Sequence, residues 1–462
     1  MKVCLLNDSF PPIIDGVANV VLNYVNHLTR DHRSPIMVGT PRYPNIDYGV
    51  HPFPVVAYSS LNIGKLVEGY RAGNPFHEKS MIAMSHFQPE IIHTHCPAMS
   101  SVMGRILRDV TGAPLIFTYH TKFDVDIKRS VKSDFLVKQA VKLMLSNIEP
   151  CDEVWVVSRG AGENLTGLGY TGEWFVMPNG VDFVKGGVSD EAVREATKDY
   201  DLPEDIPVYL FVGRLMNYKG LPIILDALKI LADQGKDFRM VFVGKGDDEE
   251  SVKDKARELG LMDNPSAPDK CIFTGPIYDR NELRAWNTRA DLFFFMSTYD
   301  TNGLVVREAA ACGLASVLVE GSCAAEDITD GRNGFMVEEN AESLAAFLLE
   351  NGDNLELLRQ TGQHAMEEIY ISWEDCVSLA YDRYQFVLDK KKAGLLPSKK
   401  NDISGKILKR MSHDFQERER IRTLSKAFFQ NINEKADSMR DNISDLSSTV
   451  SDWIEDWYKM DQ

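Results

Sequence analysis

One pattern recurs along this chain: a short apolar run, then a polar or glycine turn, and then a helical pattern. The first series of runs lies at residues 3–6, 91–95, 115–119 and 154–158, and the second at 208–213, 240–244, 272–275, 292–296 and 316–319. Runs of this length between helices are typical of buried parallel strands joined by crossover helices. The sequence therefore predicts an α/β protein of two halves, each built around a parallel sheet.

The division into domains follows from length and composition. A chain of 462 residues exceeds what one hydrophobic core usually organises. Residues 180–188 and 201–207 have linker composition and lie between the two series of runs. We therefore predict an N-terminal domain over residues 1–183 and a second domain over residues 184–372.

Two further segments follow the second domain. Ser372 and Asp375 have the spacing of a capping box, with aspartate in place of glutamate, and predict a helix over 373–395. Residues 396–462 form a tail with apolar side chains at helical spacing, a basic first part and an acidic end. We interpret the tail as a pair of helices that pack on the body of the protein or mediate self-association with a second subunit. Binding to a membrane surface is the alternative.

Charge and cysteine content argue against several classes of protein. The formal net charge of -17 disfavours nonspecific binding of nucleic acid. The seven cysteines form no CxxC pair, so we expect reduced thiols. Residues 1–8 resemble a buried strand rather than a signal peptide, and no stretch reaches the length of a membrane span. These features predict a cytoplasmic protein without disulfides.

Two carboxylates flank the start of one predicted helix. Asp300 lies in the loop before this helix, and Glu308 lies about two turns into it. Between them lie Asn302, Gly303, Leu304 and Val305. Free amides at a helix start favour a diphosphate, and the carboxylates would accept hydrogen bonds from hydroxyl groups at its two ends. A sugar and a ribose supply such hydroxyls, so a nucleotide-sugar fits this arrangement.

Two cations follow the first strand of the second half. Arg214 comes directly after Gly213 at the end of this strand, and Lys219 lies in the loop before the next helix. They suit a diphosphate leaving group, because charge builds on the diphosphate as a glycosidic bond breaks. The alternative, that both are solvated surface residues, agrees less well with the flanking glycines.

Backbone positions at two other strand ends are further candidates. Gly16, in the loop after the first strand, would let the backbone approach a ligand closely. A tight strand-to-helix turn explains this glycine equally well. Ile277 follows the run at 272–275, where its backbone groups would contact a flat base edge.

Histidine and aspartate side chains in the first half raise the question of acid–base or metal chemistry. His120 follows a predicted strand and would hydrogen-bond a sugar hydroxyl or assist proton transfer. His93 and His95 share one strand face, but two histidines without a clear third ligand favour packing over a metal site. Asp124 and Asp126 mimic a metal-binding acidic pair, which we interpret as a solvated loop because the two cations would already neutralise a diphosphate. We therefore predict no metal and no cofactor.

Residues 122–148 combine basic and apolar side chains at helical spacing. On a chain this acidic, a concentrated basic face is a candidate for contact with anionic lipid. An ordinary surface helix is the alternative.

Taken together, these segments resemble the family 4 glycosyltransferases of the GT-B fold. The matching segments are 10–16, 119–121, 178–182, 213–220, 275–276 and 300–313, and they lie within residues 1–390. The resemblance implies two facing Rossmann-like domains and a final helix that crosses back onto the first of them. It also implies a nucleotide-sugar donor on the second domain, retention of anomeric configuration and no required metal.

The resemblance implies roles for individual residues. Glu308 would bind the ribose, Arg214 and Lys219 the diphosphate, and His120 the donor sugar near the reacting carbon, while Gly16 would admit the diphosphate from the other side. The family usually has glutamate at the position of Asp300. A shorter carboxylate still accepts hydrogen bonds but reaches less far, so this motif does not fix the donor sugar.

Within the family, residues 119–124 and 300–303 look most like the enzymes that glucosylate diacylglycerol. This similarity implies UDP-glucose as the donor, a membrane glycerolipid as the acceptor and peripheral contact with the inner face of the membrane. One alternative is the same chemistry on a soluble sugar or small-molecule acceptor. Another is a non-catalytic scaffold that binds a nucleotide-sugar.

Overall fold

The computed structural model describes the chain except for residues 12, 14–15, 63–70, 124–132, 266–267 and 397–462. The chain forms two compact units. Of the described residues, the first comprises Met1–Val157, Ala161–Met177 and residues 377–396, and the second comprises Ser158–Gly160 and Pro178–Cys376. Three predictions lie wholly or partly outside the described residues: the acidic pair Asp124 and Asp126, residues 124–132 of the basic segment 122–148, and the tail beyond residue 396.

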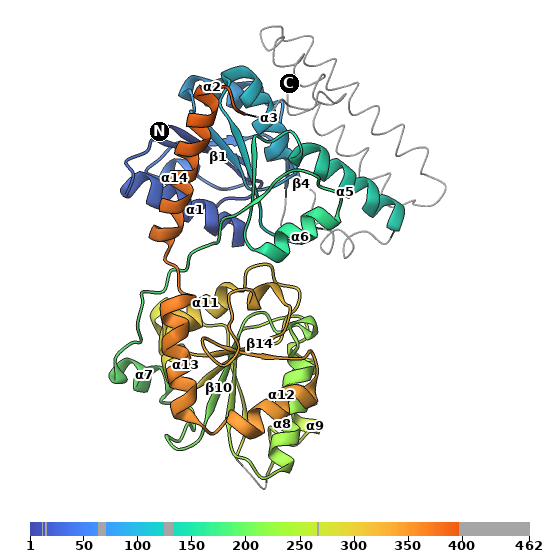
Figure 1. Cartoon of the computed structure of the whole chain (residues 1–462), viewed down its shortest axis with the longest axis vertical. Coiled ribbons are helices and arrows are strands. Elements are labelled where there is room, and N and C mark those ends of the chain that lie inside the picture. The colour runs from blue at the N-terminus through green and yellow to red at the C-terminus, as the bar shows by residue number, and fades with distance from the viewer. Residues whose placement is uncertain (12, 14–15, 63–70, 124–132, 266–267, 397–462) are drawn as a thin grey trace. The chain divides into compact units, whose positions relative to one another are not determined.

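The first unit contains a parallel sheet with the strand order β3-β2-β1-β6-β7-β8-β9 (Figure 1). Its strands are β1 (Val3–Leu6), β2 (Ile36–Pro41), β3 (Val55–Tyr58), β6 (Ile91–Thr94), β7 (Leu115–Tyr119), β8 (Glu153–Val156) and β9 (Phe175–Val176), and β4 (Ser60–Asn62) and β5 (Arg71–Gly73) form a separate antiparallel pair. Its helices are α1 (Gly16–Arg30), α2 (Glu78–Phe87), α3 (Met99–Thr111), α5 (Asp134–Ile148) and α6 (Arg159–Gly167). Side chains from α2, α3, α5 and α6 share one apolar core with one face of this sheet.

The second unit contains a parallel sheet with the strand order β12-β11-β10-β13-β14-β15. Its strands are β10 (Val208–Val212), β11 (Arg239–Val243), β12 (Cys271–Gly275), β13 (Leu292–Phe295), β14 (Ser316–Val319) and β15 (Phe335–Val337). Its helices are α7 (Asp190–Thr197), α8 (Leu221–Asp233), α9 (Glu249–Glu258), α10 (Arg280–Arg289), α11 (Leu304–Ala311), α12 (Ala341–Asn351) and α13 (Leu355–Glu368), with short 3₁₀ turns at η2 (Asn217–Lys219) and η3 (Cys323–Ala325). The α/β class and the parallel sheets predicted from the sequence are confirmed.

The strand order of the second sheet reverses between β10 and β13, which are direct neighbours. Open parallel sheets bind ligands at such a switch point, beyond the carboxyl ends of the two strands. Both predicted cations follow β10, and the loop that contains Asp300 follows β13. The topology therefore brings these two segments to the same sheet edge.

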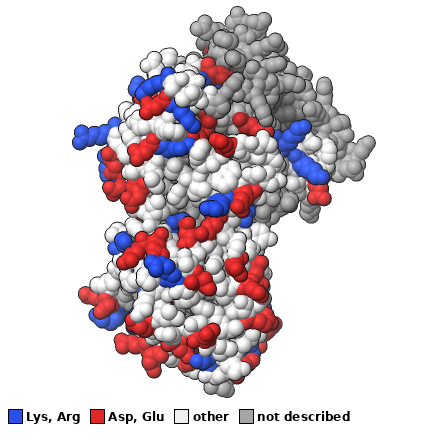
Figure 2. All heavy atoms as spheres, viewed as in Figure 1, with Lys and Arg blue, Asp and Glu red and all other residues white. Residues whose placement is uncertain are grey.

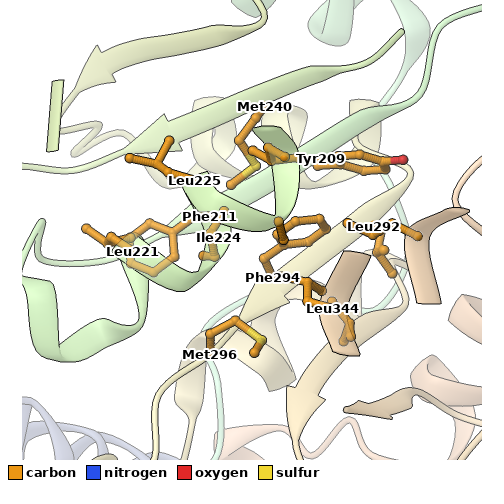
Figure 3. Packing of buried hydrophobic residues seen from close by; sticks show 14 of the residues in the cluster. Tyr209, Phe211, Leu221, Ile224, Leu225, Met240, Leu292, Phe294, Met296 and Leu344 are labelled. Carbon is orange, nitrogen blue, oxygen red and sulfur yellow. The ribbon is translucent and has the colours of Figure 1, made fainter. Parts of the chain in front are cut away.

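The core of the second unit explains why its strands read as continuous apolar runs. On β10, Tyr209 and Phe211 pack on one face of the sheet against α8 and α12, whereas Val208 and Leu210 pack on the other face. Figure 3 shows the first of these layers, in which Phe294 lies beside Tyr209 with ring centroids 5.0 Å apart. A strand buried on both faces cannot alternate polar and apolar residues, which is typical of parallel sheets.

Helix α14 (Trp373–Lys392) begins with the predicted capping box. The amide of Asp375 donates to Ser372 Oγ at 3.0 Å, and the Ser372 hydroxyl donates to Asp375 Oδ2 at 2.7 Å. From Val377 on, this helix belongs to the first unit. There, Arg383 pairs with the buried Glu153 of β8, with Nη2 2.6 Å from Oε1. This ion pair joins residues 230 positions apart in the chain and fixes α14 to the sheet of the first unit.

The cysteines, the surface charge and the hydropathy of the helices agree with the composition of the chain. All seven cysteines are free thiols, as predicted. Acidic side chains gather on the visible face of the second unit, in line with the net charge of -17 (Figure 2). Among the described residues, no helix has the length and apolar character that a membrane span requires.

Candidate active site

Helix α11 begins at Gly303, in a conformation that disfavours any side chain. Gly303 is the N-cap, with φ 57° and ψ 46°, and a Cβ at this position would lie 2.7 Å from the Cβ of Ala324. Because glycine offers no capping oxygen, no described residue accepts a hydrogen bond from the amides of Leu304 and Val305. Free amides and the dipole at a helix start favour an anion, which is the role that the loop sequence predicted for this segment.

Asn302, immediately before this glycine, adds a second observation. Both polar atoms of its side chain, Nδ2 and Oδ1, are buried and have no hydrogen-bond partner among the described residues. Buried amide groups without any partner are uncommon in folded proteins. Their position beside the α11 amides makes them candidates for hydrogen bonds to a polar ligand.

Lys219 and Asp300 come together at this edge of the sheet. The Lys219 ammonium donates to Asp300 Oδ1 at 2.5 Å and to Oδ2 at 2.7 Å, and the Ser297 hydroxyl donates to Oδ2 at 2.6 Å. Both partners of the ion pair are mostly buried, with 13% of the Lys219 side chain and 28% of the Asp300 side chain exposed. The carboxylate is thus engaged by the chain itself and holds the ammonium in place.

The glycine that follows Lys219 is required by close backbone packing. Gly220 has φ 78°, and a Cβ there would lie 2.2 Å from the carbonyl oxygen of Met296 at the end of β13. Only glycine allows η2, which ends at Lys219, to approach β13 so closely. The Lys-Gly pair singled out in the sequence therefore sets the position of the lysine.

Arg214 differs from Lys219. It follows β10 on the exposed surface, and its side chain forms no ion pair or hydrogen bond with any described residue. A guanidinium group without a partner at this sheet edge can bind an anion, but its side chain is not held in place in advance.

Glu308 lies in the second turn of α11 and pairs with an arginine that the sequence analysis did not single out. The Nη2 atom of Arg280 lies 2.5 Å from Glu308 Oε1, and 14% of the glutamate side chain is exposed. Burial raises the pKa of Glu308, Arg280 lowers it and nearby Asp182 raises it, with a net value above the ordinary one. Glu308, the residue predicted to bind the ribose, is thus a buried carboxyl group, and the guanidinium of Arg280 favours its charged form.

Arg280 had one signal in the sequence. It is the first residue of α10, where a positive charge opposes the helix dipole and calls for a compensating partner. That partner lies 28 positions away in the chain, so the pair could not be predicted from the sequence and is seen only in the folded structure.

The other predicted backbone contacts have less support. Ile277 lies in the loop after β12 and packs against the apolar core, which agrees with a place near the sheet edge. Gly16 is the first residue of α1 in the first unit, and no described atom lies within 4 Å of a Cβ built on it. No described neighbour therefore requires glycine at position 16.

His93, His95 and His120 form a buried cluster in the first unit. His95 Nδ1 lies 3.0 Å from His120 Nε2, and His93 bonds the hydroxyl groups of Tyr384 at 2.5 Å and Thr118 at 2.7 Å. This supports the packing interpretation of His93 and His95. The described residues contain no group of three or more histidine, cysteine or acidic side chains arranged to hold a metal ion.

Burial keeps these histidines neutral. It lowers the pKa of His120 to about 3 and the pKa of His93 and His95 well below their ordinary value. A ring with so low a pKa is a weak base at neutral pH. Of the two roles predicted for His120, hydrogen bonding to a hydroxyl group is therefore favoured over proton transfer.

Comparison with known families agrees with this geometry. The model described as Glycosyltransferase Family 4 matches residues 14–185, and the model described as Glycosyl transferases group 1 matches residues 193–367. The chain belongs to the family 4 glycosyltransferases. The resemblance noted in the sequence is confirmed, and the two matches meet near the boundary between the two units.

Curated relatives of this glycosyltransferase act on different substrates. It is 23% identical over 381 residues to an alpha-monoglucosyldiacylglycerol synthase of Acholeplasma laidlawii, covering 79% of this chain and 92% of the relative. It is 26% identical over 308 residues to a D-inositol 3-phosphate glycosyltransferase of Xylanimonas cellulosilytica, covering 64% of this chain and 71% of the relative. Identities this low do not fix donor or acceptor.

Solved structures of similar fold include Anabaena Alr3699/HepE in complex with UDP. The TM-score is 0.66 at 18% identity, covering 84% of this chain and 100% of the other. Sucrose-phosphate synthase from Thermosynechococcus elongatus has a TM-score of 0.63 at 20% identity, covering 84% and 99%. These likenesses confirm the GT-B fold class.

Proposed function

We propose that this glycosyltransferase moves glucose from UDP-glucose to an acceptor hydroxyl group with retention of anomeric configuration. The observation that carries the proposal is the anion site at the switch point, where an anchored lysine, an uncapped helix start and an unpartnered buried amide converge. A diphosphate between two hydroxyl-bearing groups satisfies all three. The HepE structures, which contain UDP or UDP-glucose, support this choice of donor.

The chemistry follows from charge. An ammonium group has three N–H donors. Lys219 donates to the two oxygens of Asp300, which leaves one N–H group to contact a phosphate. As the bond to the sugar breaks, negative charge grows on the diphosphate, and Lys219, Arg214 and the α11 amides stabilise it. These two cations and the amides supply the positive charge that a divalent metal would supply, so we propose that transfer needs no metal.

The donor can be tested directly. Incubation with UDP-glucose should release UDP slowly in the absence of acceptor, and EDTA should not change the rate. UDP-glucose should also raise the melting temperature more than GDP- or ADP-sugars, since a ligand stabilises the native state according to its affinity. Binding of UDP-glucose without any UDP release would instead indicate a non-catalytic scaffold.

We further propose that the acceptor is a membrane glycerolipid reached through α5. Phe135 and Leu143 lie eight positions apart on this helix with 55% and 60% of their surfaces exposed, and Lys138 and Lys142 are exposed between them. Apolar side chains flanked by lysines suit an anionic lipid surface. The glucosyldiacylglycerol synthase similarity supports a lipid acceptor.

Replacing both Phe135 and Leu143 with serine should reduce flotation with anionic vesicles by at least about tenfold, because each buried apolar side chain contributes about 1.5–3 kcal/mol. Binding of the wild-type protein should weaken as salt concentration rises. Val110→Ser, at an α3 position with 41% exposure, is the matched control and should leave flotation unchanged. A wild-type protein that does not float, yet transfers glucose to a soluble acceptor, would contradict the lipid proposal.

A further inference from the structure

Arg280 links two segments of the second unit at the candidate donor site. Its Nη2 atom lies 2.5 Å from Glu308 Oε1, and its guanidinium carbon lies 4.4 Å from the ring centroid of the buried Phe183. The arginine is thus held by a ring on one side and by a carboxylate at its end. It also follows directly on the loop that contains Ile277, the predicted base contact.

The position of Arg280 is unfavourable for helix α10 itself. Asp279 caps this helix by accepting hydrogen bonds from the amides of Asn281 and Glu282 at 2.8 and 2.9 Å. A cation in the first turn opposes the helix dipole. Helix stability therefore does not explain the arginine, whereas its pairing with Glu308 does.

The protonation state of Glu308 depends on a small number of neighbouring groups. The charged and titratable groups that face it are Arg280 on α10, Asp182 in the segment before Phe183, and Cys312 at the C-cap of α11. Burial and Asp182 both raise the pKa of Glu308, and Arg280 is the group that lowers it. Without the guanidinium, burial and Asp182 remain, and both favour the protonated carboxyl group.

The pairing also leaves part of the carboxylate available. Arg280 engages Oε1, and Oε2 bonds no described residue. A charged acceptor forms stronger hydrogen bonds with hydroxyl groups than a neutral one. An ionised Glu308 held at one oxygen can therefore present the other to a ligand.

We infer that Arg280 is a positioning residue for donor binding, which holds Glu308 as an oriented carboxylate for the ribose hydroxyl groups. This assignment rests on the proposed function and adds a residue that acts through Glu308. It predicts that removing the guanidinium weakens nucleotide binding in a pH-dependent way.

The test measures the dissociation constant for UDP by calorimetry between pH 6 and 9. At each pH the result is expressed as the dissociation constant of the variant divided by that of the wild type. This ratio removes the titration of UDP itself. Arg280→Gln should bind UDP about tenfold more weakly than wild type at the acidic end of this range, and the difference should shrink as pH rises, because a higher pH favours the ionised form of Glu308. Arg280→Lys keeps a positive charge, so its ratio should change little with pH.

Two further variants separate this role from a structural one. Arg332→Gln removes a matched arginine–glutamate pair, formed with Glu368 at 2.5 Å, and should leave UDP affinity unchanged at every pH. In the double variant Arg280→Gln/Glu308→Gln, position 308 no longer titrates, so the pH dependence should disappear. A merely structural arginine would lower the melting temperature without this pattern.

An Arg280→Gln ratio that is constant across pH, or tighter UDP binding by this variant, would overturn the inference while leaving the proposed donor intact. A wild-type protein that binds no UDP at any pH would overturn the proposed function and the inference together.

Discussion

Lys219→Ala should lower kcat/KM for UDP-glucose by about 10²–10³-fold, the range seen when one preorganised donor to a developing negative charge is removed. The ammonium group is anchored before any ligand binds, since both oxygens of Asp300 accept from it at 2.5 and 2.7 Å. A preorganised cation costs little reorganisation when charge grows on the leaving diphosphate. The loss should therefore appear mainly in kcat, measured as UDP release at saturating donor.

The chain offers a matched control for this variant. Lys229 on α8 also pairs with an aspartate, Asp233, but that pair is exposed and four positions apart on one helix. Lys229→Ala removes the same charge and should leave kcat/KM within about twofold of wild type, because exposed ion pairs contribute little. Near-normal turnover of Lys219→Ala would show that the lysine does not stabilise the leaving group.

Features of the candidate site that depend on one short segment could be predicted from the local sequence. The loop 300–308 predicted a helix start with free amides, and the structure has an uncapped helix that begins after Gly303. Likewise, the glycine after Lys219 argued against a solvated surface lysine, and Gly220 packs against the Met296 carbonyl group. Glycine at such positions reports backbone geometry directly, which is why these predictions were possible.

Partners that come from distant segments could not be predicted in the same way. Asp300 was predicted to contact the ligand, and in this structure its oxygens accept hydrogen bonds from Lys219, 81 positions away. Arg280 was missed because its partner Glu308 lies on another helix. Tyr384, which bonds His93 from α14, is separated from it by 291 positions. Periodicity and spacing carry no information on such pairs, since only the packed fold brings them together.

The buried histidines should make the first unit unstable in acid. Above pH 6.5, neither the folded nor the unfolded state protonates His120, so its contribution to stability is constant. Below pH 6.5, the unfolded state binds a proton that the folded state rejects until pH falls to about 3. His120 alone should then lower the free energy of unfolding by about 1.4 kcal/mol per pH unit. His93 and His95 act in the same direction.

Asp8 opposes this trend. Burial raises its pKa to about 6, so between pH 6 and its ordinary value of 3.8 the folded state binds a proton that the unfolded state does not. The histidines outnumber this one carboxyl group in the first unit, so the net effect of the four groups is loss of stability as pH falls from 6.5 to 4.5. The fluorescence of Trp155, which contacts His93 and stacks on Tyr384, can report unfolding of this unit.

His120→Asn isolates the contribution of one ring. It removes a group that titrates differently in the folded and unfolded states, so its stability should depend on pH less steeply than that of the wild type, by about 1.4 kcal/mol per pH unit between pH 6.5 and 4.5. His86→Asn, at an exposed position on α2, should keep the wild-type slope. Comparison of slopes is insensitive to any constant destabilisation caused by the substitution. Equal slopes for His120→Asn and wild type would mean that His120 is not held neutral by burial, and the argument against proton transfer by this residue would then fail as well.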